Sequence, residues 1–296
     1  MNFPTIDREH PYELSEEEAE IVDRLISAFL GCEKLQHHMR FLLNKGALYK
    51  IYNSNLLYHG CIPLTDDGQL KNVGIYGKIY KGRALYDALD AYIRQGFFAV
   101  DKEERRRGRD LMWYIWQGEN SPLFAKNKMA TFERYFIADK KLHKEKKGYY
   151  YTLRDNEKIC NQILEEFGVT GVHTHIINGH VPVKTIKGEQ PMKAGGKLLV
   201  IDGGFSKAYQ PETGIAGYTL VYHSHGLQLV QHEPFQSTQK AIEEGQDIKS
   251  TTFVIEFNSQ RMMVKDTDKG KELVTQIQDL KKLLVAYRTG LIKEKQ

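Results

Sequence analysis

Two short apolar segments of the chain each end in a turn that contains one glycine and one histidine. The first covers residues 55–58 and ends at His59-Gly60, and the second covers residues 174–177 and leads to Gly179-His180. Short apolar runs bounded by turn residues are typical of buried strands. Glycine lets the backbone turn sharply, so each imidazole can point into a cleft at the edge of a sheet. The pattern predicts an α/β fold with one histidine at the end of each of two strands.

Histidines in such positions have two ordinary roles. Imidazole nitrogens are ligands for manganese, iron or zinc, and two-metal sites that cleave phosphate esters hold their cations about 3.5–4 Å apart. A histidine at a strand end is more often an ordinary hydrogen-bonded side chain. Because His59 and His180 lie far apart in the sequence, only tertiary structure can bring them together.

The bulk composition is that of an ordinary folded protein. Of the 296 residues, 41% are hydrophobic and 27% are charged, and the net charge is +4, which suits small anionic ligands but does not suggest nucleic acid. No apolar run approaches the roughly 18 residues of a membrane span, and the first residues lack the pattern of a secretory signal. The three scattered cysteines favour a reducing compartment. We therefore expect a cytoplasmic protein without a membrane partner.

Hydrophobic periodicity divides the chain into helical and β-rich segments. A capping box at Ser15–Glu18 predicts a helix start. Further helices are predicted over 83–98, 103–117, 155–167 and 268–288, strands within 47–58 and 172–232, a hairpin over 70–80 and an edge strand over 251–264. We expect three parts, which are a linker and helical segment (1–46), an α/β region (47–235) with a largely helical insertion at about 70–170, and a C-terminal edge strand and helix (236–296).

Several strings of the sequence resemble one known family. They are Asn55–Leu64, Thr131–Phe136, Ile176–Lys184, Leu198–Gln210 and Thr213–Leu220. In these strings, and from Phe3 to the final helix, the chain resembles the class III fructose-1,6-bisphosphatases of bacteria, which belong to the calcineurin-like metallophosphoesterases. The resemblance implies that the chain folds as the C-terminal part of a calcineurin-like sandwich with a helical insertion.

The resemblance also implies a function and a set of metal ligands. The family hydrolyses the 1-phosphate of fructose 1,6-bisphosphate in gluconeogenesis, typically with Mn²⁺, and a metal-bound hydroxide attacks the phosphate in line. The more distant phosphoprotein phosphatases have His-Gly-Gly-Leu-Ser-Pro where this chain has His59–Leu64. His59 and His180 are thereby implied as metal ligands.

The early ligand motifs of such enzymes do not occur in the sequence. These motifs are Asp-x-His, Gly-Asp-x-x-Asp and Gly-Asn-His followed by Asp or Glu. Family members are much longer, and the resemblance implies that their additional N-terminal part holds these ligands and the general acid. We therefore expect no catalytic residue in this chain, and too few ligands to assemble the two-metal site and its electrostatic stabilisation.

Three cationic side chains are candidates for binding a sugar phosphate. Lys184 and Lys207 follow the second histidine turn and a glycine-rich loop, where each could act as a point charge. Arg134 lies among aromatic residues and could clamp a phosphate. The alternatives are a solvated side chain for each lysine, and for Arg134 a structural ion pair with a carboxylate.

Other conspicuous residues have plainer interpretations. The basic run Arg105–Arg109 could bind an anionic effector or nucleic acid, but a solvated helix start is favoured. Trp113 and Trp116 are predicted to lie in the core. The pairs His173/His175 and His223/His225 are each predicted to alternate along a strand and so to lie on one face. They could hold a metal there, although ordinary histidines are favoured.

Two alternative functions stand beside fructose-1,6-bisphosphatase. One is a non-catalytic regulatory or scaffolding module derived from that enzyme, which the absent early motifs favour. The other is a phosphoprotein phosphatase-like enzyme. The expected partner is fructose 1,6-bisphosphate, with no nucleic acid or membrane, and the sequence leaves a homo-oligomer open.

Overall fold

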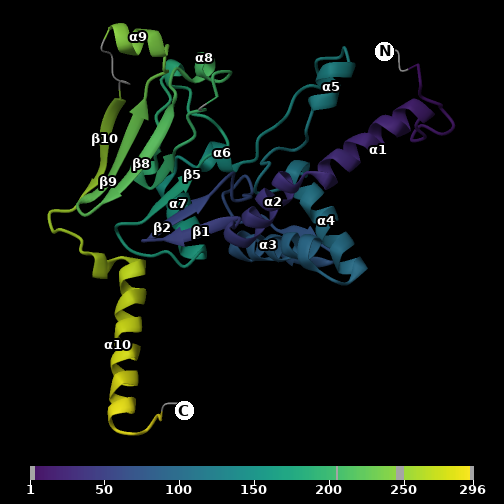
Figure 1. The fold of residues 1–296 in the computed structure, drawn as a ribbon. Helices are drawn as coiled ribbons and strands as arrows, with labels where there is room; N and C mark the ends of the chain where they lie inside the picture. Colours follow the sequence, from purple (N-terminus) through teal and green to yellow (C-terminus); the bar gives the residue numbers. More distant parts are fainter. Residues whose placement is uncertain (1–3, 205, 245–249, 294–296) are drawn as a thin grey trace. The chain divides into compact units, whose positions relative to one another are not determined.

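The computed structural model describes residues 4–204, 206–244 and 250–293 of the chain (Figure 1). It is a mixed α/β structure that divides into two compact units. Unit 1 consists of Met1–Leu48, Val73–Tyr80 and Ala84–Gly148, and unit 2 of Tyr49–Asn72, Lys81–Arg83 and Tyr149–Gln296.

Unit 1 is mainly helical. It contains α1 (Glu16–Gly31), α2 (Glu33–Lys45), the hairpin β3 (Val73–Ile75) and β4 (Lys78–Tyr80), α3 (Gly82–Phe98, from its third residue on), α4 (Lys102–Gln117) and α5 (Thr131–Phe136). The capping box at Ser15 is formed, and the predicted hairpin and helices over 83–98 and 103–117 are confirmed. Its core consists of buried side chains from β3, α3 and α4, namely Val73, Ile75, Leu85, Leu89, Leu111 and Ile115.

The two tryptophans of α4 are not in this core, so that prediction was wrong. Trp113 is 60% exposed and Trp116 55% exposed, and their rings contact each other edge to face. The buried face of α4 carries Gly108, Leu111 and Ile115. At 3.6 residues per turn these three lie on one stripe, and neither tryptophan falls on it.

Unit 2 is built on a five-stranded sheet of order β1-β2-β5-β7-β6. Its strands are β1 (Tyr49–Tyr52), β2 (Asn55–Tyr58), β5 (His175–Asn178), β6 (Met192–Lys193) and β7 (Leu198–Val200). Strands β2, β5 and β7 are parallel neighbours, whereas β1 and β6 are antiparallel edges. In register, Tyr58 lies opposite Asn178, and Asn178 lies opposite Val200. The carboxyl ends of the three central strands therefore lie side by side at one edge.

The second sheet of unit 2 is antiparallel, with β9 between β8 and β10. The strands are β8 (Gly217–His223), β9 (Gly226–His232) and β10 (Ser250–Phe257). Ile177 and Leu199 of the first sheet form a buried cluster with Leu227 of the second. Because side chains alternate along a strand, Ile176 and Leu198 point to the other face of the first sheet, where they are fully buried.

The predicted edge strand over 251–264 is correct only as far as Phe257. Beyond that residue, the amides of Asn258 and Met262 donate to the carbonyls of His225 and Ser224 in the β8–β9 turn. These bonds replace the ladder with β9, so the chain turns away from the sheet. A short 3₁₀ helix at Val264–Asp266 follows.

Helices complete unit 2. They are α6 (Tyr150–Leu153), α7 (Glu157–Glu166), α8 (Gln210–Thr213), α9 (Thr238–Glu243) and α10 (Asp268–Arg288). The predicted last helix is confirmed as α10, and Thr267 caps its start by accepting from the Gly270 amide. Asn53 and Asp268 exchange two hydrogen bonds, which fasten the start of α10 to the β1–β2 turn.

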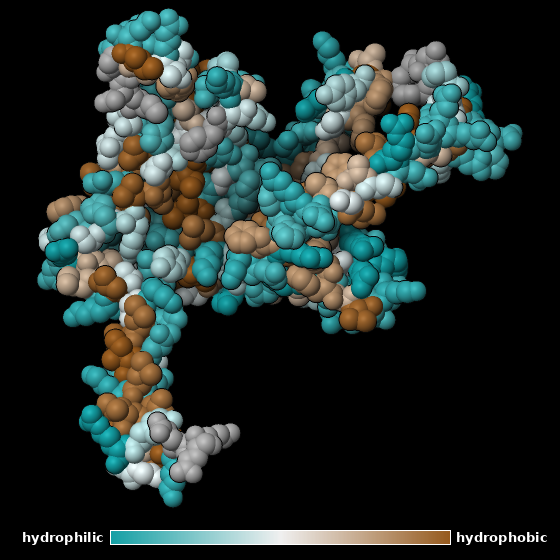
Figure 2. Space-filling model, viewed as in Figure 1, coloured by the Kyte–Doolittle hydropathy of each residue, from teal (hydrophilic) through white to brown (hydrophobic). Residues whose placement is uncertain are grey.

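Apolar side chains of α10 are exposed and gather along the helix (Figure 2). Within the described part of α10 the only buried residue is Gly270. Across residues 4–204, 206–244 and 250–293, no helix combines the length and apolar character needed to cross a membrane.

Candidate functional site

The structure brings His59 and His180 into direct contact. Nε2 of His59 lies 3.1 Å from Nδ1 of His180, and the rings meet edge to face with their centroids 5.0 Å apart. His59 is exposed and His180 is half-buried. Each follows a central parallel strand, β2 or β5, at the carboxyl edge of the sheet. This is the edge at which open α/β sheets bind their ligands.

Two hydrogen bonds hold the two histidine turns together. The Gly179 amide donates to the His59 carbonyl at 3.0 Å. The side chain of Asn178, the last residue of β5, donates from Nδ2 to the Gly60 carbonyl at 2.5 Å. Asn178 is 1% exposed, so this tie lies inside the fold. Sequence reasoning missed Asn178, although a polar residue that ends an apolar strand is a signal for such a role.

The backbone at His180 adopts a left-handed conformation, with φ at +67°. The Val181 amide donates to the Gly179 carbonyl across it at 2.8 Å. This is the rare γ-turn with a positive central φ, which costs energy for a residue other than glycine. Such strain is often found at functional sites, and here it aims the imidazole at His59.

The loop after the third parallel strand reaches the same edge. Gly179 lies close to Asp202. A Cβ added to Gly179 would stand 3.7 Å from the Cβ of Asp202. Oδ1 of Asp202 accepts from the Gly204 amide, and its carbonyl accepts from the Val183 amide. Three strand-end loops therefore meet here. Phe205, within the predicted loop, lies outside the described residues.

The two imidazoles fit part of a metal-ligand set. Nitrogens that each lie about 2.0–2.1 Å from one ion are roughly 3–3.5 Å apart, and the observed separation of His59 Nε2 and His180 Nδ1 is 3.1 Å. Within the described part of the chain, no group of three or more His, Cys, Asp and Glu side chains is placed to hold an ion. The pair therefore offers two ligands of an incomplete set.

The two candidate lysines have different surroundings. Nζ of Lys184 forms an ion pair with Glu212 at 3.2 Å, and the Lys184 amide donates to Glu189. Lys207 is exposed in the turn before α8. A phosphate at Lys184 would therefore compete with Glu212.

Arg134 is engaged in a structural network of unit 1. Its Nη2 lies 3.3 Å from Glu145. Glu145, which is 8% exposed, also pairs with Lys126 at 2.6 Å and accepts from the Ala130 amide. This is the structural alternative that the sequence left open, with Glu145 as the carboxylate.

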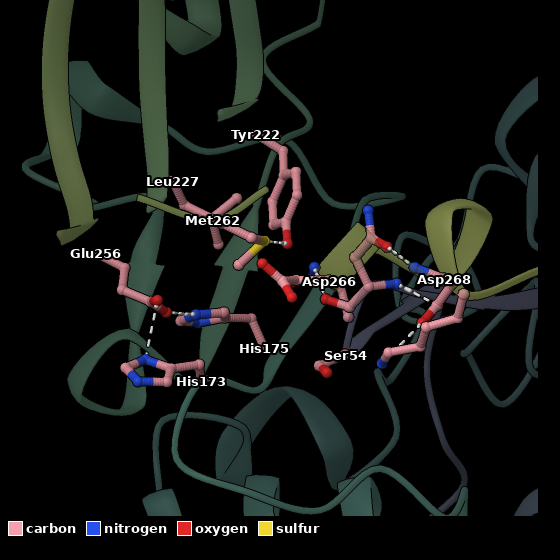
Figure 3. A pocket seen from close by; sticks show the side chains of 12 residues that line it. Ser54, His173, His175, Tyr222, Leu227, Glu256, Met262, Asp266 and Asp268 are labelled. Atoms are coloured by element: carbon pink, nitrogen blue, oxygen red, sulfur yellow. Dashed lines mark hydrogen bonds and ion pairs between the residues drawn. The ribbon is translucent and has the colours of Figure 1, made fainter. Parts of the chain in front are cut away.

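A second polar group lies in a pocket of unit 2 (Figure 3). Glu256 of β10 faces two histidines, with His173 Nδ1 at 2.9 Å and His175 Nε2 at 2.7 Å. Nδ1 of His175 also contacts the Gly196 carbonyl at 2.8 Å. Each ring nitrogen of His175 therefore contacts an oxygen acceptor. His175 links the two sheets, because β5 belongs to one and β10 to the other.

Neither histidine pair lies on a single strand, because β5 begins only at His175. His223 ends β8, whereas His225 lies in the β8–β9 turn. Nδ1 of His223 accepts from the His225 amide, and Nδ1 of His225 contacts the Asn258 carbonyl. The expectation that both residues lie on one strand was therefore wrong.

Sequence comparisons show the family to which this chain belongs. The chain matches the Firmicute fructose-1,6-bisphosphatase family over residues 1–289, and it belongs to that family. It is 72% identical over 295 residues to the fructose-1,6-bisphosphatase class 3 of Bacteroides fragilis (strain YCH46), 68% identical to that of Bacteroides thetaiotaomicron, and 59% identical over 294 residues to that of Clostridium botulinum (strain 657 / Type Ba4).

These alignments cover 99% of this chain but 44% of each of the three relatives. The chain therefore spans less than half the length of the curated relatives that it matches. No solved structure matches the chain.

Proposed function

We propose that this chain contributes His59 and His180 to the active site of a fructose-1,6-bisphosphatase. The observation that carries the proposal is the 3.1 Å approach of their ring nitrogens at the carboxyl edge of the parallel sheet. The substrate is fructose 1,6-bisphosphate, and the reaction is hydrolysis of its 1-phosphate in gluconeogenesis. The remaining metal ligands and the general acid come from the part of the relatives' length that this chain does not span.

Mn²⁺ is the metal that we propose for this pair. Bound there, it supplies a Lewis acid that polarises the phosphoryl group and activates water. Other residues of this chain position the two histidines. Asn178 and Gly179 fix the spacing of the two turns, and the γ-turn at His180 sets the direction of its ring. A calcineurin-like sandwich is the finer fold proposal, supported by the face-to-face packing of the two sheets in unit 2.

Lys184 and Lys207 remain proposed phosphate contacts near the same loops. Lys207 is the better placed of the two, because its side chain is exposed and forms no ion pair with the described residues. A cytoplasmic location is supported by Cys32, Cys61 and Cys160, which form no disulfide within the described part of the chain. The predicted division into parts at residues 46, 70–170 and 235 remains a proposal as well.

The test uses a full-length relative that carries the equivalent substitutions. His59→Ala and His180→Ala should each lower phosphate release from fructose 1,6-bisphosphate about 100-fold or more and reduce bound manganese, because each removes a direct ligand. His38→Ala is the matched control, since His38 is exposed on α2. Normal turnover and metal content in His180→Ala would contradict the assignment.

A non-catalytic module is the second candidate function. The specific observation in its favour is that the described residues offer no complete metal-ligand group. Mixing this chain with the remaining part of a relative separates the two proposals. Phosphate release in the mixture alone supports a split active site, whereas folded but inactive mixtures support the module. Phosphopeptides, tested in parallel, address a phosphoprotein phosphatase.

A further inference from the structure

Arg154 is a buried cation that forms no ion pair with a carboxylate of the described residues. The residue follows α6 and is 9% exposed. Its guanidinium lies over the Tyr151 ring, with Cζ 5.0 Å from the ring centroid. Nη1 is buried and has no hydrogen-bond acceptor among the described residues.

The nearest acidic residues in the sequence are directed elsewhere. Oδ1 of Asp155 accepts from the Ala194 amide at 2.8 Å. Oε2 of Glu157 faces Gly195, at 3.9 Å from where a Cβ would stand. The backbone of Arg154 is satisfied, since its amide donates to the Tyr150 carbonyl and its own carbonyl accepts from the Cys160 thiol. Among the described residues, Nη1 of the guanidinium has no polar partner.

An unpaired buried guanidinium is expensive to maintain. Arginine cannot lose its proton in a protein, and an isolated buried charge is normally paired or hydrogen-bonded. The face of one tyrosine offsets part of this cost, but it accepts no hydrogen bond in the plane of the guanidinium. An anion bound at Nη1 would supply both the charge and the acceptor.

The surroundings of Arg154 are neutral and can donate hydrogen bonds. The hydroxyls of Tyr58 and Tyr150 lie 2.8 Å apart, and burial raises the pKa of Tyr150 and of Tyr151. Neither Tyr150 nor Tyr151 is therefore ionised to balance Arg154 at neutral pH. Tyr58 directly precedes His59, so the tyrosines adjoin the loop of the candidate metal ligand.

We propose that Arg154 is an anion-binding residue and that its ligand is a phosphate group. The planar guanidinium matches phosphate oxygens in a two-pronged geometry that a lysine cannot reproduce. This inference rests on the proposed function in one respect, which is that the phosphate belongs to the sugar bisphosphate. The anion site itself requires neither the metal nor catalysis.

The experiment measures phosphate binding to this chain by calorimetry, with inorganic phosphate and fructose 1,6-bisphosphate as probes. Arg154→Met removes the charge and keeps the bulk, and it should weaken binding of both probes about tenfold or more. Arg154→Lys keeps the charge and should weaken binding less. Arg261→Met is the matched control, because Arg261 is an exposed arginine of the same unit.

Thermal unfolding gives the second measurement. Phosphate should raise the Tm of the unsubstituted chain and of Arg261→Met, but not that of Arg154→Met. Without phosphate, Arg154→Met should be as stable as the parent or more stable, because an unpaired buried charge has been replaced by an apolar side chain. A large loss of Tm without phosphate would indicate a purely structural arginine and overturn the proposal.

Equal phosphate affinity in the parent chain and Arg154→Met, or no binding by the parent, would also overturn it. Should Arg154→Met not fold, the comparison of Arg154→Lys with the parent decides, and equal affinities count against the proposal. Phosphate binding at Arg154 in a protein whose histidines bind no metal would leave the anion site standing while the proposed function fails.

Discussion

At the scale of single residues, the three cysteines occupy contrasting environments. Cys32 is exposed between α1 and α2, whereas Cys61 and Cys160 are buried. Burial raises the pKa of each buried thiol to about 12. Only a thiolate is a strong nucleophile, so the buried pair should be unreactive near neutral pH.

We predict that an Ellman assay of the native chain at pH 8 titrates one thiol, at Cys32, and that all three react after unfolding in urea. Cys32→Ser should abolish the native reaction, whereas Cys160→Ser should leave it unchanged. Rapid reaction of two or three native thiols would contradict the burial of Cys61 and Cys160.

The same pKa shifts have a consequence for stability. A folded pKa above the unfolded value of about 9 means that ionisation favours the unfolded chain. The contribution of the buried thiols to the free energy of unfolding is therefore complete below about pH 9. It is lost as the pH rises toward 12. Urea unfolding of the parent and Cys160→Ser across this range should show a smaller loss of stability in the variant.

The sequence could predict the histidine pair but not its neighbours. His59 and His180 each adjoin a glycine at the end of an apolar strand, and that local pattern is visible without a structure. The partners of Lys184 and Arg134, which are Glu212 and Glu145, depend on tertiary packing. The burial of Arg154 has no local signature, because the short helix α6 that precedes it carries no clear apolar period.

At the scale of elements, helices α3 and α4 approach closely at two glycines of unit 1. A Cβ at Gly108 would meet the backbone of Gly96 and the Tyr92 carbonyl. Gly108 is buried on the same face of α4 as Leu111. The glycine therefore permits a close helix crossing at the edge of the core.

We predict that Gly108→Ala destabilises the chain by about 1–3 kcal/mol, because the backbones must separate to admit the methyl group. Gly31→Ala, at the end of α1 where a Cβ meets nothing within 4 Å, should be neutral or slightly stabilising. Urea unfolding followed by circular dichroism measures both. Equal stability of the two variants would mean that the crossing is looser than described.

Long periodic helices were predictable, whereas strand limits were not. The apolar positions of α3 and α10 repeat over four or more turns, so each is recognised from its own sequence. The end of β10 is decided by hydrogen bonds from Asn258 and Met262 to the β8–β9 turn. The two-residue strand β6 exists only because it pairs with β7. Neither the end of β10 nor the pairing of β6 can be recognised from the local sequence.

At the scale of the whole molecule, both units expose apolar side chains on helices. In α1, Leu25 and Phe29 are 55% and 63% exposed, and in α10, Ile277 and Leu280 are 51% and 64% exposed. Soluble proteins rarely expose large contiguous apolar patches. The described residues bury little of either helix.

We predict that the chain binds the dye ANS in its native state. Replacing Ile277, Leu280 and Leu284 together by lysine should lower the dye fluorescence. Because these side chains are already exposed, each replacement should change the unfolding free energy by no more than about 0.5 kcal/mol. Lysine at Thr275, Gln276 and Asp279 is the control, and it should leave the fluorescence unchanged. Strong destabilisation by the first set would show that the stripe is packed.

The parallel pairing of β2 with β5 also affects the order in which parts of the chain fold. His59 and His180 are 121 residues apart in the chain, and the whole segment between them must be gathered before their strands can pair. Contacts of such long separation form slowly, because the entropy of closing the loop is lost before the pairing is gained. Helices such as α3 and α4 can form early from local contacts. We therefore expect the two imidazoles to meet after α3 and α4 have formed.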